Sequence, residues 1–123
     1  MKQVNLQEMT LYQLVDRFTQ IGVSQDQALL ENAIAKFNRL FDQMVATEEE
    51  LKSRSGDQRR ALLALYKHPN MQVRLNAVKA TLAVAPQEAR AMLQKIADSN
   101  FFPQAGDAGM ALVNLERGIF KPT

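Results

Sequence analysis

The stretch HPNMQVRLNAVKATLAVAPQEARAML, residues 68–93, decides the fold because it contains two helix boundaries in close succession. Asn70 comes directly after Pro69 and is suited to cap a helix, since its side-chain oxygen can accept from a free N–H of the first turn. Pro86 stops this helix and suits the first turn of the next one. The first helix has an apolar stripe at 4-3-4 steps: Val73, Ala77, Ala80 and Val84. The stretch therefore predicts two helices joined by a very short link.

The rest of the chain also has helical periodicity, and we find no alternation typical of a strand. The clearest break is at Gly56, which suits the left-handed end of one helix, and Asp57, which suits the cap of the next. A last helix is predicted to open at Pro103 and to end near Gly118. The chain has 123 residues, 46% of them hydrophobic, so we expect six or seven helices in a single domain over residues 1–123.

Two helices are predicted before the break at Gly56. Asn5 is suited to cap the first, which Gly22 ends, and Ser24 is suited to cap the second. The expected buried stripe of the second helix has 4-3-4-3 steps: Leu30, Ile34, Phe37, Phe41 and Met44. Thr47 leaves two alternatives, because with the acidic residues after it this residue can start a third helix, or the second helix can run through it.

A weak internal repeat appears when the chain is shifted by 31 residues. The shift places Ala77 and Ala80 on Ala108 and Ala111, and small residues at these positions let neighbouring helices approach closely. A repeated pair of helices predicts an all-α protein, a short right-handed α-α superhelix of helical hairpins. An irregular helical bundle that reuses alanine is the alternative.

The step Val73-Arg74, with Pro69 before it and an alanine three residues later, resembles a HEAT-type repeat. From about Leu11 to Gly118 the chain resembles the DUF2019 family, small bacterial HEAT-like proteins of unknown function. The resemblance rests on FNRLF (37–41), ELKSRSGDQRRALLAL (50–65), VRLNAVKATLA (73–83) and FFPQAGDAGMAL (101–112). It implies a HEAT- or armadillo-like superhelix and brings no catalytic residues. Some small HEAT-like proteins bind partners or neutralise toxins, which applies to this chain only by analogy.

Several classes of function lack the residues that they need. The chain has no cysteine, which excludes a disulfide framework, a cysteine nucleophile and a thiolate metal site. It has one histidine, His68, and no pair of residues at metal-ligand spacing, so we expect no enzymatic activity, no cofactor and no metal. No apolar run reaches the about 18 residues of a membrane span, and no signal peptide is apparent. We therefore expect a cytoplasmic protein without a membrane segment.

Charge is distributed unevenly, with a net −4 in residues 1–50 and +6 in residues 51–123. Seven basic residues are candidates for a surface that binds nucleic acid: Arg59, Arg60, Lys67, Arg74, Lys79, Arg90 and Lys95. However, the chain has no tryptophan and only two tyrosines on which bases could stack. Nucleic acid is therefore the second hypothesis, and two faces of one domain that differ in sign are the simpler explanation.

The preferred hypothesis is a protein-binding module, because the second helix of each pair in stacked repeats often lines a concave surface. The candidate contact residues are the polar flank of the helix after Asn70, which is Gln72, Asn76 and Lys79. In the last helix they are Asp107, Met110 and Asn114, onto which the 31-residue shift places Asn76, Lys79 and Ala83. A solvated face without a partner is the open alternative. Phe101 and Phe102 form another candidate patch, although we expect them to pack in the core or as a hydrophobic staple before Pro103. A homodimer is the third class, since a second copy could cover an apolar end.

Arg74 follows the buried Val73, so its stem can pack at the edge of the core while its guanidinium stays near water. The resemblance to the repeat family implies a structural role, in which the Val-Arg step pairs with an acid or with loop carbonyls. We therefore expect Arg74 to hydrogen-bond to backbone or to a carboxylate such as Asp107 or Asp57. Pro69, Gly56 and Asp57 are likewise expected to be structural.

Overall fold

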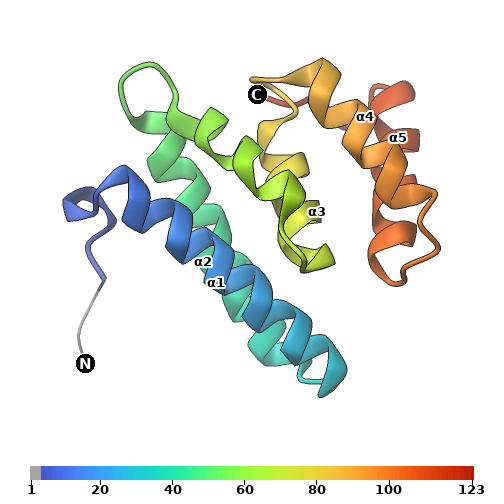
Figure 1. Ribbon diagram of the computed structural model, residues 1–123, viewed down its shortest axis with the longest axis horizontal. Coiled ribbons are helices and arrows are strands. Elements are labelled where there is room, and N and C mark those ends of the chain that lie inside the picture. The colour runs from blue at the N-terminus through green and yellow to red at the C-terminus, as the bar shows by residue number, and fades with distance from the viewer. Residues whose placement is uncertain (1–3) are drawn as a thin grey trace. The chain divides into compact units, whose positions relative to one another are not determined.

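The computed structural model describes residues 4–123, and within that range it contains helices and no strand. Five α-helices and two 3-10 helices follow in the order η1 (Leu6–Glu8), α1 (Leu11–Leu30), α2 (Ile34–Ser53), η2 (Gln58–Lys67), α3 (Met71–Thr81), α4 (Pro86–Ala97) and α5 (Gln104–Glu116) (Figure 1). The prediction of an all-α fold built from helical hairpins is confirmed. The chain divides into two compact units, the first ending at Ala61 and the second comprising Leu62–Thr123. A single domain over residues 1–123 stays a prediction.

The first unit is built on α1 and α2, which lie side by side as a hairpin (Figure 1). Leu14 and Phe18 of α1 and Leu51 of α2 are fully buried in it. Thr10 caps α1, because its side chain accepts from Gln13 N–H at 3.1 Å while the Gln13 side chain accepts from Thr10 N–H at 2.9 Å. The chain therefore enters the hairpin through a complete capping box.

The predicted start and end of the first helix are wrong. Asn5 caps the short η1 and not α1, and α1 runs through Gly22 and Ser24 to Leu30. Gly22 is buried inside the helix, although glycine costs about 1 kcal/mol relative to alanine there. Tertiary packing along the hairpin outweighs this local preference, as it commonly does for helices of this length.

The stripe that was expected to be buried in the second helix is largely exposed. Leu30, Ile34 and Phe41 are 77%, 67% and 46% exposed, whereas Met44 is buried. With α1 extended to Leu30, the turn between the helices shifts, so Leu30 and Ile34 lie at the tip of the hairpin. A two-helix hairpin buries the sides that face each other, and residues at its tip have no second layer within the unit.

Thr47 lies inside α2 and not at a helix start, so the second of the two alternatives is confirmed. Its side chain is fully buried, and the hydroxyl donates to the Gln43 carbonyl at 2.8 Å, one turn earlier. This internal hydrogen bond satisfies the hydroxyl that would otherwise cap a new helix. The acidic residues that follow therefore belong to the last turns of α2.

The break after α2 forms as predicted. Gly56 and Asp57 both have left-handed backbone, with φ of 78° and 53°, which turns the chain sharply. Asp57 does not begin a regular α-helix; it accepts from Arg59 N–H at 3.3 Å and pairs with the Arg59 guanidinium at 2.7 Å. The segment that follows is the 3-10 helix η2.

In the second unit α3, α4 and α5 pack together (Figure 1). The core is formed by nine buried apolar side chains from these helices and their links: Leu75, Val78, Leu82, Ala89, Leu93, Ile96, Ala108, Ala111 and Leu115. The predicted stripe residues Val73, Ala77 and Ala80 are also buried, so α3 is enclosed on more than one side. Small side chains on α3 and α5 allow this close packing, as the repeat suggests.

The starts of α3 and α4 agree with the prediction from the opening stretch, but α3 ends at Thr81, so Val84 lies beyond the helix and not in its buried stripe. Asn70 caps α3 by accepting from Val73 N–H at 3.1 Å, and Pro86 occupies the first turn of α4. Pro103 directly precedes α5, and Gly118 takes left-handed backbone after it, with φ of 70°. Within residues 4–123, no helix is long and apolar enough to cross a membrane.

Candidate functional site

A cleft of about 540 Å³ lies on the second unit, where α3, α5 and the C-terminal turn meet. Four of the six candidate contact residues line it together with two others: Lys79, Asp107, Met110, Ala111, Asn114 and Phe120. The cleft thus brings residues from positions 79 to 120 into one surface. These four were predicted from the polar flank after Asn70 and from the 31-residue shift, which aligns Lys79 with Met110.

Charged groups bridge one rim of the cleft. Lys79 of α3 and Asp107 of α5 form an ion pair with Nζ and Oδ1 3.0 Å apart. Their side chains are 39% and 47% exposed, so water screens the pair and its contribution to stability is below about 1 kcal/mol. The pair therefore positions two charged groups at the rim without committing either of them to the core.

The lining of the cleft is mostly apolar. Ala111 is buried, whereas Met110 is 63% exposed. A methionine side chain is flexible and polarisable, and such side chains adapt to partners of different shapes. An apolar centre with a polar rim is the usual anatomy of a protein-binding surface.

Asn114 holds the C-terminal turn that closes the cleft. Its carbonyl accepts from Ile119 N–H at 2.9 Å and from Phe120 N–H at 3.1 Å. Gly118 makes this reversal possible because its φ of 70° is unfavourable for residues with a Cβ. The turn brings Phe120 to the cleft, a contribution that the sequence analysis missed because Phe120 lies outside the repeat.

Gln72 and Asn76 do not belong to this surface, so the predicted open polar flank is wrong at these two positions. Each is only 6% exposed, and Gln72 Nε2 donates to Asn76 Oδ1 at 2.9 Å. The Gln104 side chain of α5 donates to Gln72 Oε1 at 3.0 Å across the unit. Buried amides need such partners, and this chain of hydrogen bonds ties α3 to α5.

Arg74 donates a hydrogen bond to a backbone carbonyl, which is one of the two kinds of partner expected for it. Its Nε donates to the carbonyl of His68 at the turn before α3. The two carboxylates named as alternatives are paired elsewhere, Asp107 with Lys79 and Asp57 with Arg59. Arg74 is only partly exposed, so it fixes the turn to the helix and does not project from an open basic surface.

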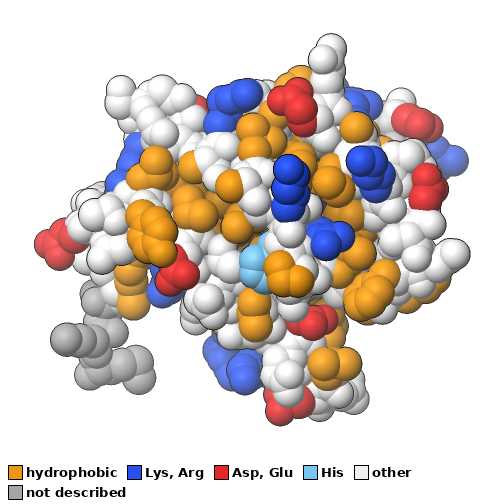
Figure 2. Space-filling view, viewed as in Figure 1, with side chains coloured by type: hydrophobic (Ala, Val, Ile, Leu, Met, Phe, Trp, Pro, Cys, Tyr) orange, Lys and Arg blue, Asp and Glu red, His pale blue; other side chains and the backbone are white. Residues whose placement is uncertain are grey.

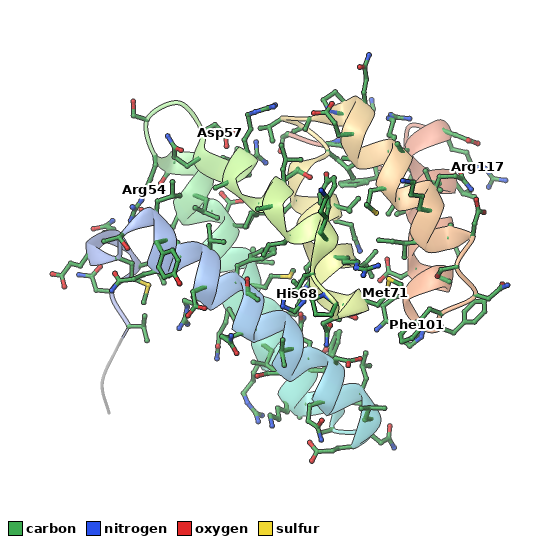
Figure 3. The ribbon with its side chains drawn as sticks, viewed as in Figure 1. Arg54, Asp57, His68, Met71, Phe101 and Arg117 are labelled. Carbon is green, nitrogen blue, oxygen red and sulfur yellow. The ribbon has the colours of Figure 1, made fainter. Side chains whose placement is uncertain are left out.

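The single histidine also serves this turn. His68 Nδ1 accepts from Asn70 N–H at 3.0 Å, next to the exposed Pro69 (Figure 3 labels His68). In the described part of the chain, no group of three or more histidine, cysteine or acidic side chains is placed to hold a metal ion. The imidazole of His68 is thus used in the turn before α3.

Phe101 and Phe102 are 54% and 67% exposed, so they do not pack in the core, which was one of the two expected alternatives. They lie in the turn before α5, and Figure 2 shows that apolar side chains also reach the surface of the protein. Phe102 covers Gly106 on the first turn of α5, where a Cβ would lie 3.7 Å from the ring. The ring thus rests on a helix that presents no side chain at that point.

Several of the seven candidate basic residues are engaged within the protein. Arg59 is buried and paired with Asp57, Arg74 bonds to the His68 carbonyl, and Lys79 pairs with Asp107. Four others are exposed: Arg60, Lys67, Arg90 and Lys95. The set predicted from the sequence therefore does not act as one group of uncommitted cations.

Comparison with known proteins gives a family and a solved structure. The family model described as Domain of unknown function (DUF2019) matches residues 12–116. The crystal structure of the protein RPA1889 from Rhodopseudomonas palustris CGA009 is similar to this chain, with 55% sequence identity and a TM-score of 0.95. The match covers 98% of this chain and 100% of that chain. No curated protein matches the sequence.

Proposed function

The chain belongs to the DUF2019 family, and from that premise we propose that it is a non-enzymatic module that binds another protein through the cleft between α3, α5 and the C-terminal turn. The observation that carries the proposal is the exposure of Met110 in a mostly apolar cleft that the Lys79–Asp107 pair also lines. An apolar side chain of the partner enters the cleft, and polar groups of the partner meet the two charges at the rim.

The lining of the cleft can supply binding free energy through apolar area that a partner covers. Exposed apolar area contributes about 25 cal/mol for each Å² that a partner covers. Met110 is the most exposed apolar residue of the lining. The Lys79–Asp107 pair stays partly hydrated, so a partner that covers it must offer hydrogen bonds in return. This requirement makes the apolar centre the source of affinity and the rim the source of specificity.

From the sequence we also propose that the hairpins stack as in a HEAT-like repeat, that the protein is cytoplasmic and that it has no catalytic activity. The structural use of His68 in the turn before α3 supports the last of these, since no other histidine is present.

The test is affinity purification from cells in which the protein naturally occurs, with the wild type and two charge-introducing variants. Met110→Glu places a carboxylate in the apolar centre, and Leu30→Glu places one at an exposed site of the first unit, 77% exposed in the wild type. We expect one stoichiometric protein with the wild type and with Leu30→Glu. Binding by Met110→Glu should fall on the order of tenfold or more, as for an interface hot spot.

A photoreactive amino acid at position 110 identifies the contact directly, with the same residue at position 30 as the control. Crosslinks from position 110 to the copurified protein support the proposal. Equal retention of the partner by Met110→Glu contradicts it. Recovery of ribosomes and nucleic acid alone also contradicts it and favours the nucleic-acid hypothesis instead.

A further inference from the structure

A second concave surface lies on the first unit and is independent of the α3–α5 cleft. It is a groove of about 480 Å³ along the α1–α2 hairpin. Met9 and one side of α1 between Tyr12 and Ser24 form most of its lining, and Leu40 and Gln43 of α2 complete it. The charged side chains in this lining are Arg17 and its neighbour Asp16.

Arg17 is unusual among the arginines of this unit. Its Nε atom is buried and has no hydrogen-bond partner, and no bond or ion pair joins Arg17 to another residue in the range 4–123. By contrast, Arg54 Nε donates to Glu50 and Arg59 Nε donates to Asp57, each at 2.9 Å. The same unit therefore pairs two guanidinium Nε groups with carboxylates and leaves the Arg17 group without an acceptor.

The Nε–H of a guanidinium is a hydrogen-bond donor, and the group has no acceptor atom. Leaving such a donor buried and unsatisfied is unfavourable, and an acceptor that reaches it removes this penalty. A carboxylate fits best, because its two oxygens can accept from Nε–H and from one terminal N–H at the same time. Arg17 lines a groove that is open to solvent, so a ligand in the groove contacts the Arg17 side chain.

We propose that this groove binds a carboxylate group through Arg17. The charge of the surroundings favours a carboxylate over a phosphate, because Arg17 is the one cation of the lining and Asp16 lies beside it. The first fifty residues have a net charge of −4, which repels a dianion more than a monoanion. Tyr12, Ser24 and Gln43 can add neutral hydrogen bonds to the rest of the ligand.

The signal of the Arg17 side chain in ¹⁵N–¹H spectra tests the proposal, because the Nε–H group can be observed directly. The probes are sodium acetate and sodium chloride, added to the full chain at equal ionic strength. We expect acetate to move the Arg17 Nε–H signal to lower field and chloride to leave it in place. Arg39, an exposed arginine of α2, provides the reference signal and should respond equally little to both salts.

Peptides distinguish the sources of the carboxylate. One capped tripeptide has a central glutamate, a second has glutamine in its place, and a third has a free C-terminus and no acidic side chain. Stronger binding of the first identifies an acidic side chain as the ligand, stronger binding of the third identifies a chain terminus, and a response to acetate that exceeds both identifies a small free acid. The glutamine peptide should give no shift at the Arg17 signal.

Two variants of Arg17 distinguish the contribution of the planar guanidinium group from that of the positive charge. Arg17→Met should reduce affinity for the best probe on the order of tenfold or more, and Arg17→Lys should do nearly the same, since lysine keeps the charge but lacks the fork. Arg39→Met is the matched control and should leave affinity unchanged. The proposal is overturned if the Arg17 signal responds equally to acetate and chloride, if no carboxylate moves it, or if Arg17→Met binds the probe as the wild type does.

Discussion

Arg54 and Arg74 show how single arginines act as structural links in this protein. Arg54 donates through Nη2 to the carbonyls of Leu6 at 3.1 Å and Met9 at 2.7 Å, so it fixes η1 to the end of α2 (Figure 3). Arg74 makes the corresponding bond to the His68 carbonyl in the second unit. A guanidinium can bridge several carbonyls because its donors point in fixed directions.

The Asp57–Arg59 pair makes the stability of the first unit depend on pH. The hydrogen bond from Arg59 holds the pKa of the Asp57 carboxyl below its ordinary value of 3.8. An acid whose pKa is lower in the folded state stabilises the fold above its unfolded pKa, and this contribution is lost as the pH falls through the lowered value. Neutral conditions therefore favour the paired turn after α2.

We predict that Asp57→Asn reduces the free energy of unfolding by a constant amount between about pH 5 and pH 7 and that the difference from wild type shrinks in stronger acid. Asparagine tolerates the left-handed backbone at this position, so the change removes the charge without straining the turn. Urea denaturation at a series of pH values measures the effect. Asp42→Asn removes a carboxylate from an exposed site of α2 and is the control; an identical pH profile for both variants would contradict the prediction.

At the scale of elements, α1 and α2 show how packing fixes helix ends and buried faces. Gly22 and Ser24 have the composition of a helix boundary, but both lie inside α1. Phe18 of α1 is fully buried, whereas Phe41 of α2 is 46% exposed although it belongs to a stripe of helical period. The period of a stripe tells which residues share a face, and the neighbouring helix decides whether that face is covered.

We predict that Phe18→Ala destabilises the protein by about 3–5 kcal/mol, because it leaves a cavity in the hairpin core. Phe41→Ala, the matched control on the other helix, should cost about 1 kcal/mol or less, since half of its ring is already in water. Urea or thermal denaturation followed by circular dichroism gives both values. Equal losses would mean that Phe41 is covered in solution and that the exposed stripe has a partner.

At the scale of the whole molecule, the second part of the chain has an excess of basic residues. In the structure, several of them pair with carboxylates or with a backbone carbonyl. Lys79 and Arg74 have partners in the second unit, and Arg59 has one in the first. Counterion release drives nucleic-acid binding only when several cations act on one surface. We therefore expect little affinity for nucleic acid.

We predict no shift of duplex DNA or single-stranded RNA in gels run at low salt, at protein concentrations that saturate the protein partner. A basic protein that binds phosphates would instead bind tightly at low salt and lose affinity steeply as salt rises. A salt series with the wild type, and with Arg90→Gln and Lys95→Gln as exposed-charge variants, measures this dependence. A steep salt response that these variants weaken would favour the nucleic-acid hypothesis.

Much of the fold follows from signals that act over a few residues. The cap at Asn70, the first-turn proline at Pro86 and the left-handed Gly56 could be predicted because each depends on local backbone geometry. The all-α class follows from the same periodicity. Part of the α3–α5 cleft could also be predicted, since a repeat aligns Lys79 with Met110.

The sequence by itself therefore determined that this protein is helical and where several of its helices begin, because capping and proline geometry are local. Only the tertiary structure decided which faces are covered. It buries the polar Gln72 and Asn76 between α3 and α5, exposes Ile34 at the hairpin tip, and leaves the Nε of Arg17 without an acceptor. The physical reason is that burial and hydrogen-bond partners depend on residues distant along the chain, whose positions no local pattern specifies.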